Sequence, residues 1–176
     1  MKKSLFLILF FSAFVASSQE KLGKPFFTGT FNFTLGVNEN YTINNDEGEY
    51  FIEPAAIFLR TGFGYEFKRR VAISFNVGFD YHWNYAVSAF PTYGTLKYNI
   101  TEDDDTLFIE ASYGKMWRPS PNYPDGNYYG FGIGVQVSGS NRWNTLVRLD
   151  LHRKGIYGFE NNRLDSISLG IGFSFF

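Results

Sequence analysis

Residues 71–82 read Val-Ala-Ile-Ser-Phe-Asn-Val-Gly-Phe-Asp-Tyr-His, and every odd-numbered position among them carries a large apolar side chain. The even-numbered positions carry small, polar or charged side chains, and the series ends with Asp80 and His82. Side chains of a β-strand point alternately to its two faces, so this period of two predicts a long strand with one apolar and one polar face.

Seven further segments show the same alternation. Each is roughly 9–12 residues long, which is the length that a tilted strand needs to cross a bilayer. They span residues 27–37, 55–67, 92–100, 107–117, 129–137, 143–152 and 167–175. The repetition predicts an all-β fold in which about eight antiparallel strands form a closed transmembrane barrel.

The connections between these segments are predicted to alternate in length. Short ones lie at residues 68–70, 101–105 and 138–141, and longer ones at 38–54, 83–90, 118–127 and 153–165. Short turns on one side and long loops on the other are typical of barrels of the outer membrane, where the short turns face the periplasm. An even number of strands places both chain ends on the side of the short turns.

The chain starts with the pattern of a secretion signal. Lys2 and Lys3 precede a mostly apolar run over residues 5–15, and the small residues Ala16-Ser17-Ser18 follow. We therefore expect a cleaved signal peptide at residues 1–18 and one barrel domain at 19–176, exported to the outer membrane of a Gram-negative bacterium. The sequence contains no cysteine, so stability cannot come from disulfides.

Charge decides which face of the barrel meets lipid. The polar faces carry several ionisable residues, and an Arg or Lys at the middle of a lipid-facing surface costs roughly 2–4 kcal/mol. They are Arg60, Glu66, Asp80, Lys97, Glu110, Arg148 and Asp150. We expect these residues to face the lumen. The alternative is a soluble, lipocalin-like barrel with its large apolar residues inside.

The ends of the predicted strands carry amphipathic aromatic residues. Trp83 and Trp117 fall at outer ends and Trp143 at a periplasmic end, which favours belts at the two membrane interfaces over ordinary core positions. Lys115 is an exception on an apolar face, and its position near an outer end lets its stem reach the headgroups.

The composition agrees with a transmembrane barrel. Aromatic residues make up 20% of the chain, yet the mean hydropathy is −0.18, because half of each strand would face a polar lumen. The formal net charge of −1 provides no basis for nucleic-acid binding, and no phosphate-binding loop is present. Gly130-x-Gly132-x-Gly134 lies within a predicted strand and precedes no helix, so it is not a phosphate-binding motif.

With its signal peptide, hairpin rhythm and a final strand that ends in Phe176, the chain resembles the small, porin-like outer-membrane barrels of the OmpA-like and OmpX-like groups. Its start and its richness in Asn, Tyr and Phe look like proteins of Bacteroidetes. The resemblance implies contact with outer-membrane lipid and lipopolysaccharide, and with the barrel-assembly machinery that reads a terminal aromatic residue. Phe176 lies one residue out of register with the apolar series that ends at Phe175.

Candidate chemistry is confined to two pairs on the polar faces, Asp80-x-His82 and Asp150-x-His152. Such groups could bind a metal or activate a water, and they faintly resemble the acidic and Asp-His groups of omptin barrel proteases. The favoured alternative is that they pair with Arg60, Arg148 and Lys97 in a lumen network. We therefore expect no catalytic residue, no cofactor and no metal.

The loops are candidates for contact with an external ligand or partner. Three prolines stiffen residues 118–126, and acidic or basic residues occur in the first and last loops. These are Glu39, Asp46, Glu47, Glu49, Arg153, Lys154 and Arg163. The sequence thus predicts a non-enzymatic outer-membrane barrel with a structural or surface-binding role and a lumen filled by charged side chains. The alternatives are a barrel hydrolase that uses the Asp-His pairs, or a narrow pore for small solutes.

Overall fold

The computed structural model describes residues 23–37, 52–83, 86–101, 103–118, 125–139, 142–155 and 162–176, and almost all of them lie in eight strands. No helix in these ranges is long and apolar enough to span a membrane. The strands are β1 (Gly23–Val37), β2 (Ile52–Phe67), β3 (Val71–His82), β4 (Val87–Asn99), β5 (Thr106–Trp117), β6 (Gly126–Ser138), β7 (Trp143–Gly155) and β8 (Arg163–Phe175).

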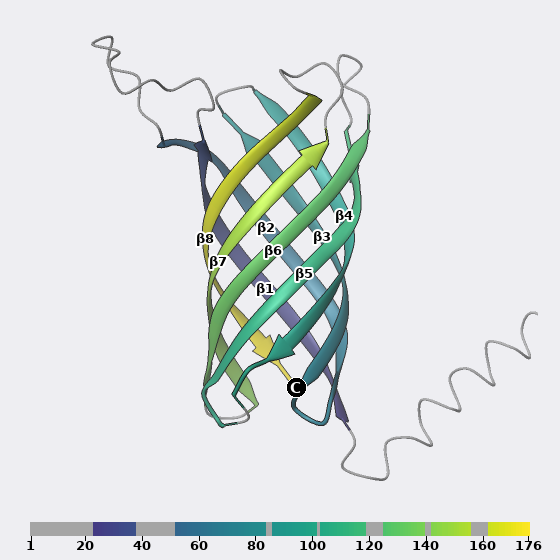
Figure 1. Cartoon of the computed structure of the whole chain (residues 1–176), viewed down its shortest axis with the longest axis vertical. Coiled ribbons are helices and arrows are strands. Elements are labelled where there is room, and N and C mark those ends of the chain that lie inside the picture. The colour runs from purple at the N-terminus through teal and green to yellow at the C-terminus, as the bar shows by residue number, and fades with distance from the viewer. Residues whose placement is uncertain are drawn as a thin grey trace, which may run out of the picture.

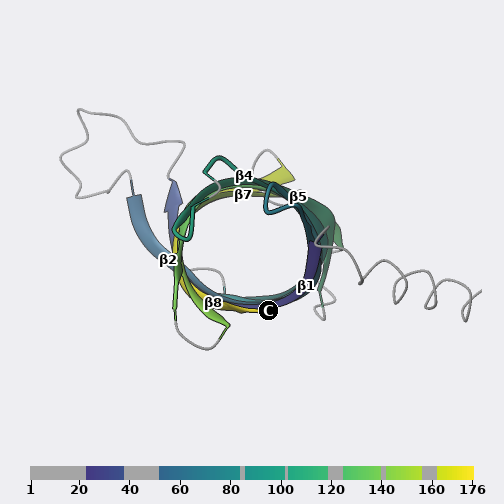
Figure 2. The same ribbon diagram turned by 90° about the horizontal axis from the view of Figure 1, so that it is seen from below.

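The eight strands form one closed antiparallel sheet in which each strand pairs with its neighbours in sequence. The circle is closed by β1 and β8, which pair from Phe27 with Phe175 through to Gly36 with Ser166. Figure 1 shows the tilt of the strands, and Figure 2 shows the closed ring viewed along the barrel axis. The predicted all-β, eight-stranded closed barrel is confirmed.

The alternation of the sequence becomes the division between the outside and the lumen. In β3, Phe75 is 61% exposed on the outside, whereas Asn76 next to it is 8% exposed and points into the lumen. The same division holds around the ring, where large apolar residues of all eight strands are exposed. A soluble barrel would bury those residues, so the lipocalin-like alternative is wrong.

The two ends of the barrel differ. We call one the turn end: here only short stretches of chain join β2 to β3, β4 to β5 and β6 to β7, and the chain ends at Phe176 (Figure 1). Lys68 and Arg69 adopt φ values of 47° and 58° in the first of these turns. The opposite end, at which β1, β3, β5 and β7 finish, is the loop end.

The aromatic residues at the strand ends take the predicted outward positions. Trp83 and Trp117 lie at the loop end and Trp143 at the turn end, and each is between 38% and 48% exposed. Lys115 also faces outward near the loop end, with its Nζ 4.5 Å from the centre of the Trp117 ring.

The predicted long loop at residues 83–90 is wrong. Strand β4 begins at Val87, and Ala86 closes a tight connection by donating its N–H to the Trp83 carbonyl at 3.2 Å, with a φ of 49°. The alternation fails there because Val87, Ala89 and Pro91 are apolar yet face the lumen, where Ala89 packs against Met116. The last predicted loop is also shorter, since β7 continues to Gly155 and β8 starts at Arg163.

Several sequence-based predictions fall outside the described residues. The signal peptide at 1–18 is one, and the acidic residues of the first loop and the three prolines of the third are others. They remain predictions.

A charged substitution at an outward position should cost more stability near the middle of a strand than near its end. Val147 pairs with Val135 and Ile171 in mid-strand, so Val147→Arg should lower the free energy of unfolding in lipid vesicles by about 2–4 kcal/mol. Val137 faces outward close to the turn end, so the matched variant Val137→Arg should cost at most about 1 kcal/mol. Urea titrations of the refolded proteins measure both values. Equal costs at the two depths would contradict the lipid-facing assignment.

Candidate functional site

The lumen near the loop end holds a cluster of buried charges. Arg60 of β2 forms an ion pair with Asp80 of β3, and Lys154 of β7 reaches the same carboxylate from the opposite wall, with Nζ 2.7 Å from Oδ2. The side chains of Asp80 and Lys154 are fully buried and that of Arg60 is 6% exposed. Two cations thus share one carboxylate, and the contact joins strands on different sides of the barrel.

Lys154 is a lumen residue that the sequence analysis assigned to the last loop. It lies in β7 at the same parity as Arg148, Asp150 and His152, all of which face the lumen. The polar series at every second residue was a signal that could have found it. The strand was predicted to end three residues too early, at residue 152, because β7 carries Arg153 and Lys154 in succession.

The two histidines approach the same aromatic ring from different strands. The ring of Phe58 is fully buried, and its centre lies 5.4 Å from that of His82 and 5.3 Å from that of His152. Lys154 Nζ lies 3.7 Å from the centre of the Phe58 ring and donates to His82 Nε2 at 2.8 Å. The structure therefore brings the predicted Asp80–His82 pair to Lys154 and Phe58, which the prediction did not include.

A second cluster surrounds Arg148, deeper in the lumen. Its guanidinium forms a bidentate pair with Asp150, with both N–O distances 2.7 Å, and it also pairs with Glu110 of β5. Asn32 of β1 donates to Asp150 Oδ2 at 2.9 Å. A Cβ on Gly132 would collide with the Asp150 carboxylate, so this glycine of β6 makes room for the cluster. The predicted lumen contacts of Arg60 and Arg148 are confirmed.

Lys97 does not make the predicted contact with the Asp-His pairs. Its ammonium donates to Gln136 Oε1 at 3.1 Å and lies 5.1 Å from the centre of the Phe108 ring, on the side of the lumen that faces the turn end. The reason is its position along the barrel axis. Lys97 lies near the turn end, whereas the Asp-His pairs lie near the loop end. Between Lys97 and Arg148 is a small cavity of about 40 Å³, which Tyr93 and Glu110 also line.

His152 lies between two hydroxyl groups. Its Nε2 is 2.7 Å from Ser168 Oγ, and its Nδ1 is 2.7 Å from the Tyr128 hydroxyl. A neutral imidazole donates through one nitrogen and accepts through the other, so both contacts satisfy it. A serine beside a histidine is also the arrangement of a nucleophile with its base. Ser168 is, however, 0% exposed, so a substrate could reach its hydroxyl only after the lumen had opened.

The four predicted candidates therefore do not form one site. Asp80 is held by Arg60 and Lys154, and Asp150 by Arg148 and Asn32, while the histidines lie on either side of Phe58. Within the part of the chain that the structure describes, no group of three His, Asp or Glu side chains could hold a metal. The Ser168 and Tyr128 contacts of His152 were not predicted, since neither residue forms a short motif with it.

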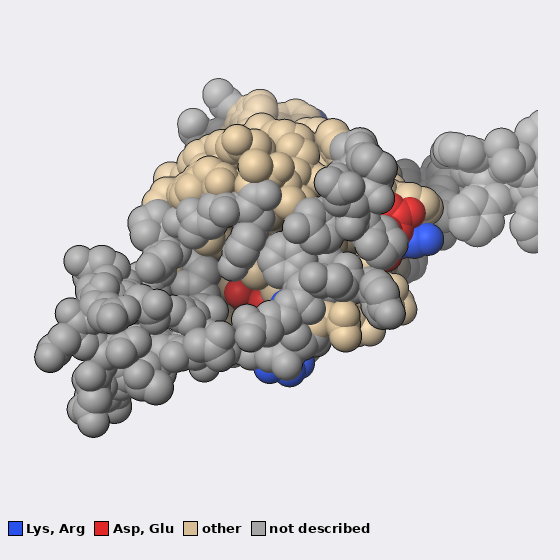
Figure 3. Space-filling model, turned by 90° about the horizontal axis from the view of Figure 1, so that it is seen from above, with Lys and Arg blue, Asp and Glu red and all other residues tan. Residues whose placement is uncertain are grey.

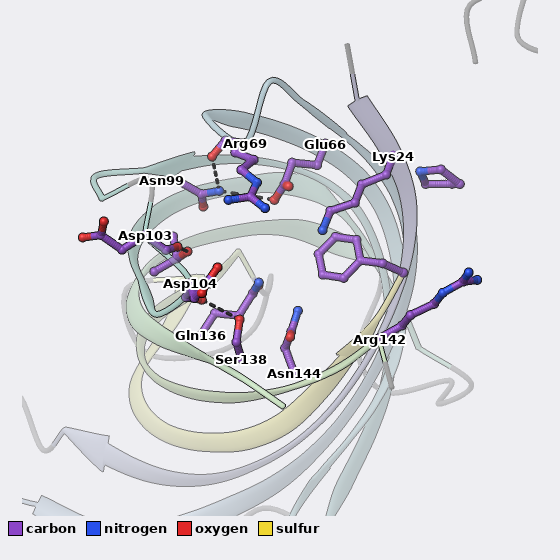
Figure 4. A pocket seen from close by; sticks show the side chains of 13 residues that line it. Lys24, Glu66, Arg69, Asn99, Asp103, Asp104, Gln136, Ser138, Arg142 and Asn144 are labelled. Atoms are coloured by element: carbon purple, nitrogen blue, oxygen red, sulfur yellow. Dashed lines mark hydrogen bonds between the residues drawn. The ribbon is translucent and has the colours of Figure 1, made fainter. Parts of the chain in front are cut away.

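At the turn end the lumen opens into a polar cavity of about 500 Å³. Figure 4 shows Lys24 and Glu66 pointing into this cavity, and Asn99, which donates to Glu66 Oε2 at 3.2 Å. Further charged residues that line it are Arg69, Asp103, Asp104 and Arg142. Its lining mixes both signs of charge and contains no arrangement that selects one kind of ligand.

Phe176 lines this cavity as well. Its ring lies 5.9 Å from that of buried Phe26, and Lys24 Nζ lies 3.4 Å from its centre. Phe175 faces outward and is 39% exposed. The residue that is out of register in the sequence thus turns its ring toward the lumen, and its N–H donates to the Arg142 carbonyl at 3.2 Å.

Proteins of known structure share this architecture. No protein-family model matches the sequence, and no curated protein matches it. Among solved structures, the Neisserial surface protein A (NspA) superposes with a TM-score of 0.66 at 9% identity, covering 87% of this chain and 97% of the other. The chain has the fold of a small outer-membrane β-barrel.

Two further structures support this assignment. The N-terminal β-barrel domain of Pseudomonas aeruginosa OprF matches with a TM-score of 0.55 at 16% identity, covering 87% of this chain and 99% of that domain. The outer membrane protein AlkL matches with a TM-score of 0.52 at 15% identity, covering 90% and 92%. At these identities the likeness extends to the fold, and the expected origin in Bacteroidetes stays a prediction.

The Arg148 cluster should be sensitive to the loss of its cation. Arg148→Ala leaves the largely buried carboxylates of Glu110 and Asp150 without their shared partner, so unfolding should become easier by about 3 kcal/mol. Adding Glu110→Gln and Asp150→Asn to that variant should restore most of the loss. Arg153→Ala breaks a pair whose arginine side chain is 56% exposed and should cost less than about 1 kcal/mol. Equal losses in the two single variants, measured by urea unfolding, would contradict a buried network.

Proposed function

We propose that this chain is an integral protein of the bacterial outer membrane with a structural or surface-binding role, and that side chains fill its lumen. The observation that carries the proposal is the distribution of charge. Large apolar residues face outward in every strand, whereas Arg60, Asp80, Arg148 and Lys154 are directed inward and paired. Such a surface is stable in lipid and would aggregate in water.

The filling of the lumen is supported at three levels along the barrel axis. The cluster of Asp80 and Lys154 lies near the loop end, and the cluster of Arg148 lies below it. Phe26 and Phe176 meet near the turn end. An eight-stranded barrel has an interior just wide enough for side chains to fill it. The cavity of about 40 Å³ between the middle and lower levels has the size for a water molecule or two, not for a solute path.

We place the turn end on the periplasmic side of the membrane and the loop end on the cell exterior. A barrel without an open channel acts through what it presents at its surface, and loops positioned by a rigid scaffold commonly bind partners. The residues expected to do so, at 38–51 and 119–124, belong to the long connections predicted from the sequence. The paired aromatic residues Phe175 and Phe176 suit recognition by the barrel-assembly machinery.

A barrel hydrolase is the second candidate, and the contact between Ser168 and His152 is the observation in its favour. Catalysis needs a nucleophile that a substrate can reach and donors that stabilise the developing oxyanion. Ser168 is enclosed by Asn32 and His152, whose contacts occupy its hydroxyl. The geometry favours a structural role for this pair.

Membrane insertion should make the protein heat-modifiable. Closed barrels keep every strand paired in detergent, so an unboiled sample should migrate faster on a gel than a boiled one. The protein should be found in the outer-membrane fraction. As a control, Phe31→Pro removes a backbone hydrogen bond from β1 and should abolish the fast band. Recovery from the soluble periplasm without a mobility shift would refute the proposed location.

The filled lumen should prevent large ionic currents. We expect the purified protein to show no stable large conductance steps in planar bilayers. The double variant Phe58→Ala/Tyr128→Ala removes two large, almost fully buried lumen side chains and should produce steps if it folds. The matched variant Phe75→Ala changes an outward ring and should behave like the wild type. Large stable currents from the wild type would refute the filled lumen.

A further inference from the structure

The outer surface of β6, β7 and β8 near the loop end carries two adjacent cross-strand rows of different character. The row closer to the loop end contains Tyr129, Arg153 and Asp165, which are register partners across the three strands. The next row toward the barrel middle contains the apolar partners of Phe131, namely Leu151 and Ile167. A shallow groove of about 760 Å³ runs along both rows.

The apolar side of the groove continues toward the middle of the barrel. The next outward row is Ile133, Leu149 and Leu169, and the following one is Val135, Val147 and Ile171. All six side chains are at least 40% exposed. The surface below the polar row is thus an unbroken apolar track that lipid chains can follow.

The polar row and the next row toward the loop end, where Arg163 pairs with Gly155, together carry one more basic than acidic group. Arg153 forms a bidentate pair with Asp165 at 2.8 and 2.7 Å, and Arg163 Nε lies 3.6 Å from the same carboxylate. The side chains of both arginines nevertheless remain 56% and 43% exposed. Viewed from the loop end, basic and acidic side chains are both visible on the barrel (Figure 3).

The position of these charges on the barrel is also informative. Among the described strand residues that face outward, the charged ones all lie near the loop end, and three of the four are basic. They are Lys115, Arg153, Arg163 and Asp165. The ring centres of Tyr129 and Tyr113 are 5.2 Å apart, and Lys115 lies over the Trp117 ring, so the row has the depth of an interfacial aromatic belt. At this depth a basic side chain meets lipid headgroups.

We propose that this groove binds a phosphate-bearing lipid of the outer leaflet, with the phosphate on Arg153 and Arg163 and one acyl chain along Phe131, Leu151 and Ile167. Arginine binds phosphate oxygens through several parallel N–H groups, and an anionic headgroup complements the basic excess. A free phosphate ion would make no contact with the apolar row that directly adjoins Arg153. The inference rests on the outer-membrane location proposed above and adds a ligand class and a site to it.

The test uses the full mature chain refolded in phosphatidylcholine vesicles that contain a small fraction of a diphosphorylated glucosamine glycolipid. A parallel sample contains the dephosphorylated glycolipid with the same acyl chains. After extraction into detergent, mass spectrometry counts the glycolipid molecules that stay with each folded barrel. The wild type should retain the phosphorylated lipid in preference to its dephosphorylated counterpart.

Three variants locate the site. Arg153→Gln and Arg163→Gln should each reduce retention of the phosphorylated lipid about fivefold, the effect of one basic group near an anionic headgroup. Arg70→Gln removes an equal charge from the turn at residues 68–70, at the other end of the barrel, and should leave retention unchanged. Gel mobility of unboiled samples shows whether each variant has folded. If Arg153→Gln does not fold, Arg163→Gln provides the test of the site.

Two results would overturn the inference. One is equal retention of the two glycolipids by a wild-type barrel that shows its heat-modifiable band. The other is an equal loss of lipid in Arg70→Gln and Arg153→Gln, which would indicate a general charge effect. Failure of the wild type to insert into vesicles at all would refute the proposed function instead, so the two failures can be distinguished.

Discussion

The pairing of β1 with β8 is the contact on which the rest of this structure depends. Within a bilayer no water is available to a strand edge, so an open sheet would leave two rows of backbone N–H and C=O groups unsatisfied. Ten register pairs, from Phe27 with Phe175 to Gly36 with Ser166, remove both edges at once. Closure also creates the lumen, and with it the need to accommodate every side chain that the alternation directs inward.

Inside the lumen, oppositely charged side chains pair with one another. Burying an unpaired ion is costly, whereas a well-connected pair recovers most of the cost through ion pairing and hydrogen bonds. Asp80 accepts from Arg60 and Lys154, and Arg148 is shared by Glu110 and Asp150. Aromatic rings lie among these groups, with Phe58 under the Lys154 ammonium, so the interior combines ionic and apolar packing. Such an interior favours one arrangement of the strands, because each of these cations has a partner on another strand.

Much of the fold could be predicted because one face of each strand meets lipid and the other meets the lumen. The alternation in β3, β6 and β8 follows directly from that difference. It fails in β4 at Val87–Pro91, where apolar residues face inward and the pattern loses its contrast. The site was harder to predict. Lys154 could have been placed from its parity with His152, whereas the meeting of Lys154 with Asp80 depends on the geometry of the closed ring, which a one-dimensional pattern does not contain.

The sequence separation of the lumen contacts has a consequence for assembly. Asn32 and Asp150 are 118 residues apart, and Lys154 and His82 are 72 residues apart. These contacts cannot form while the sheet is still open, because only the pairing of β1 with β8 brings β1 and β3 within reach of β7. Folds with such non-local contacts pay the entropy of loop closure before the contacts stabilise them, and they fold slowly. Until the last hairpin arrives, Lys154 and Asp150 stay hydrated, so water leaves the interior late, in the step that joins the two ends of the sheet.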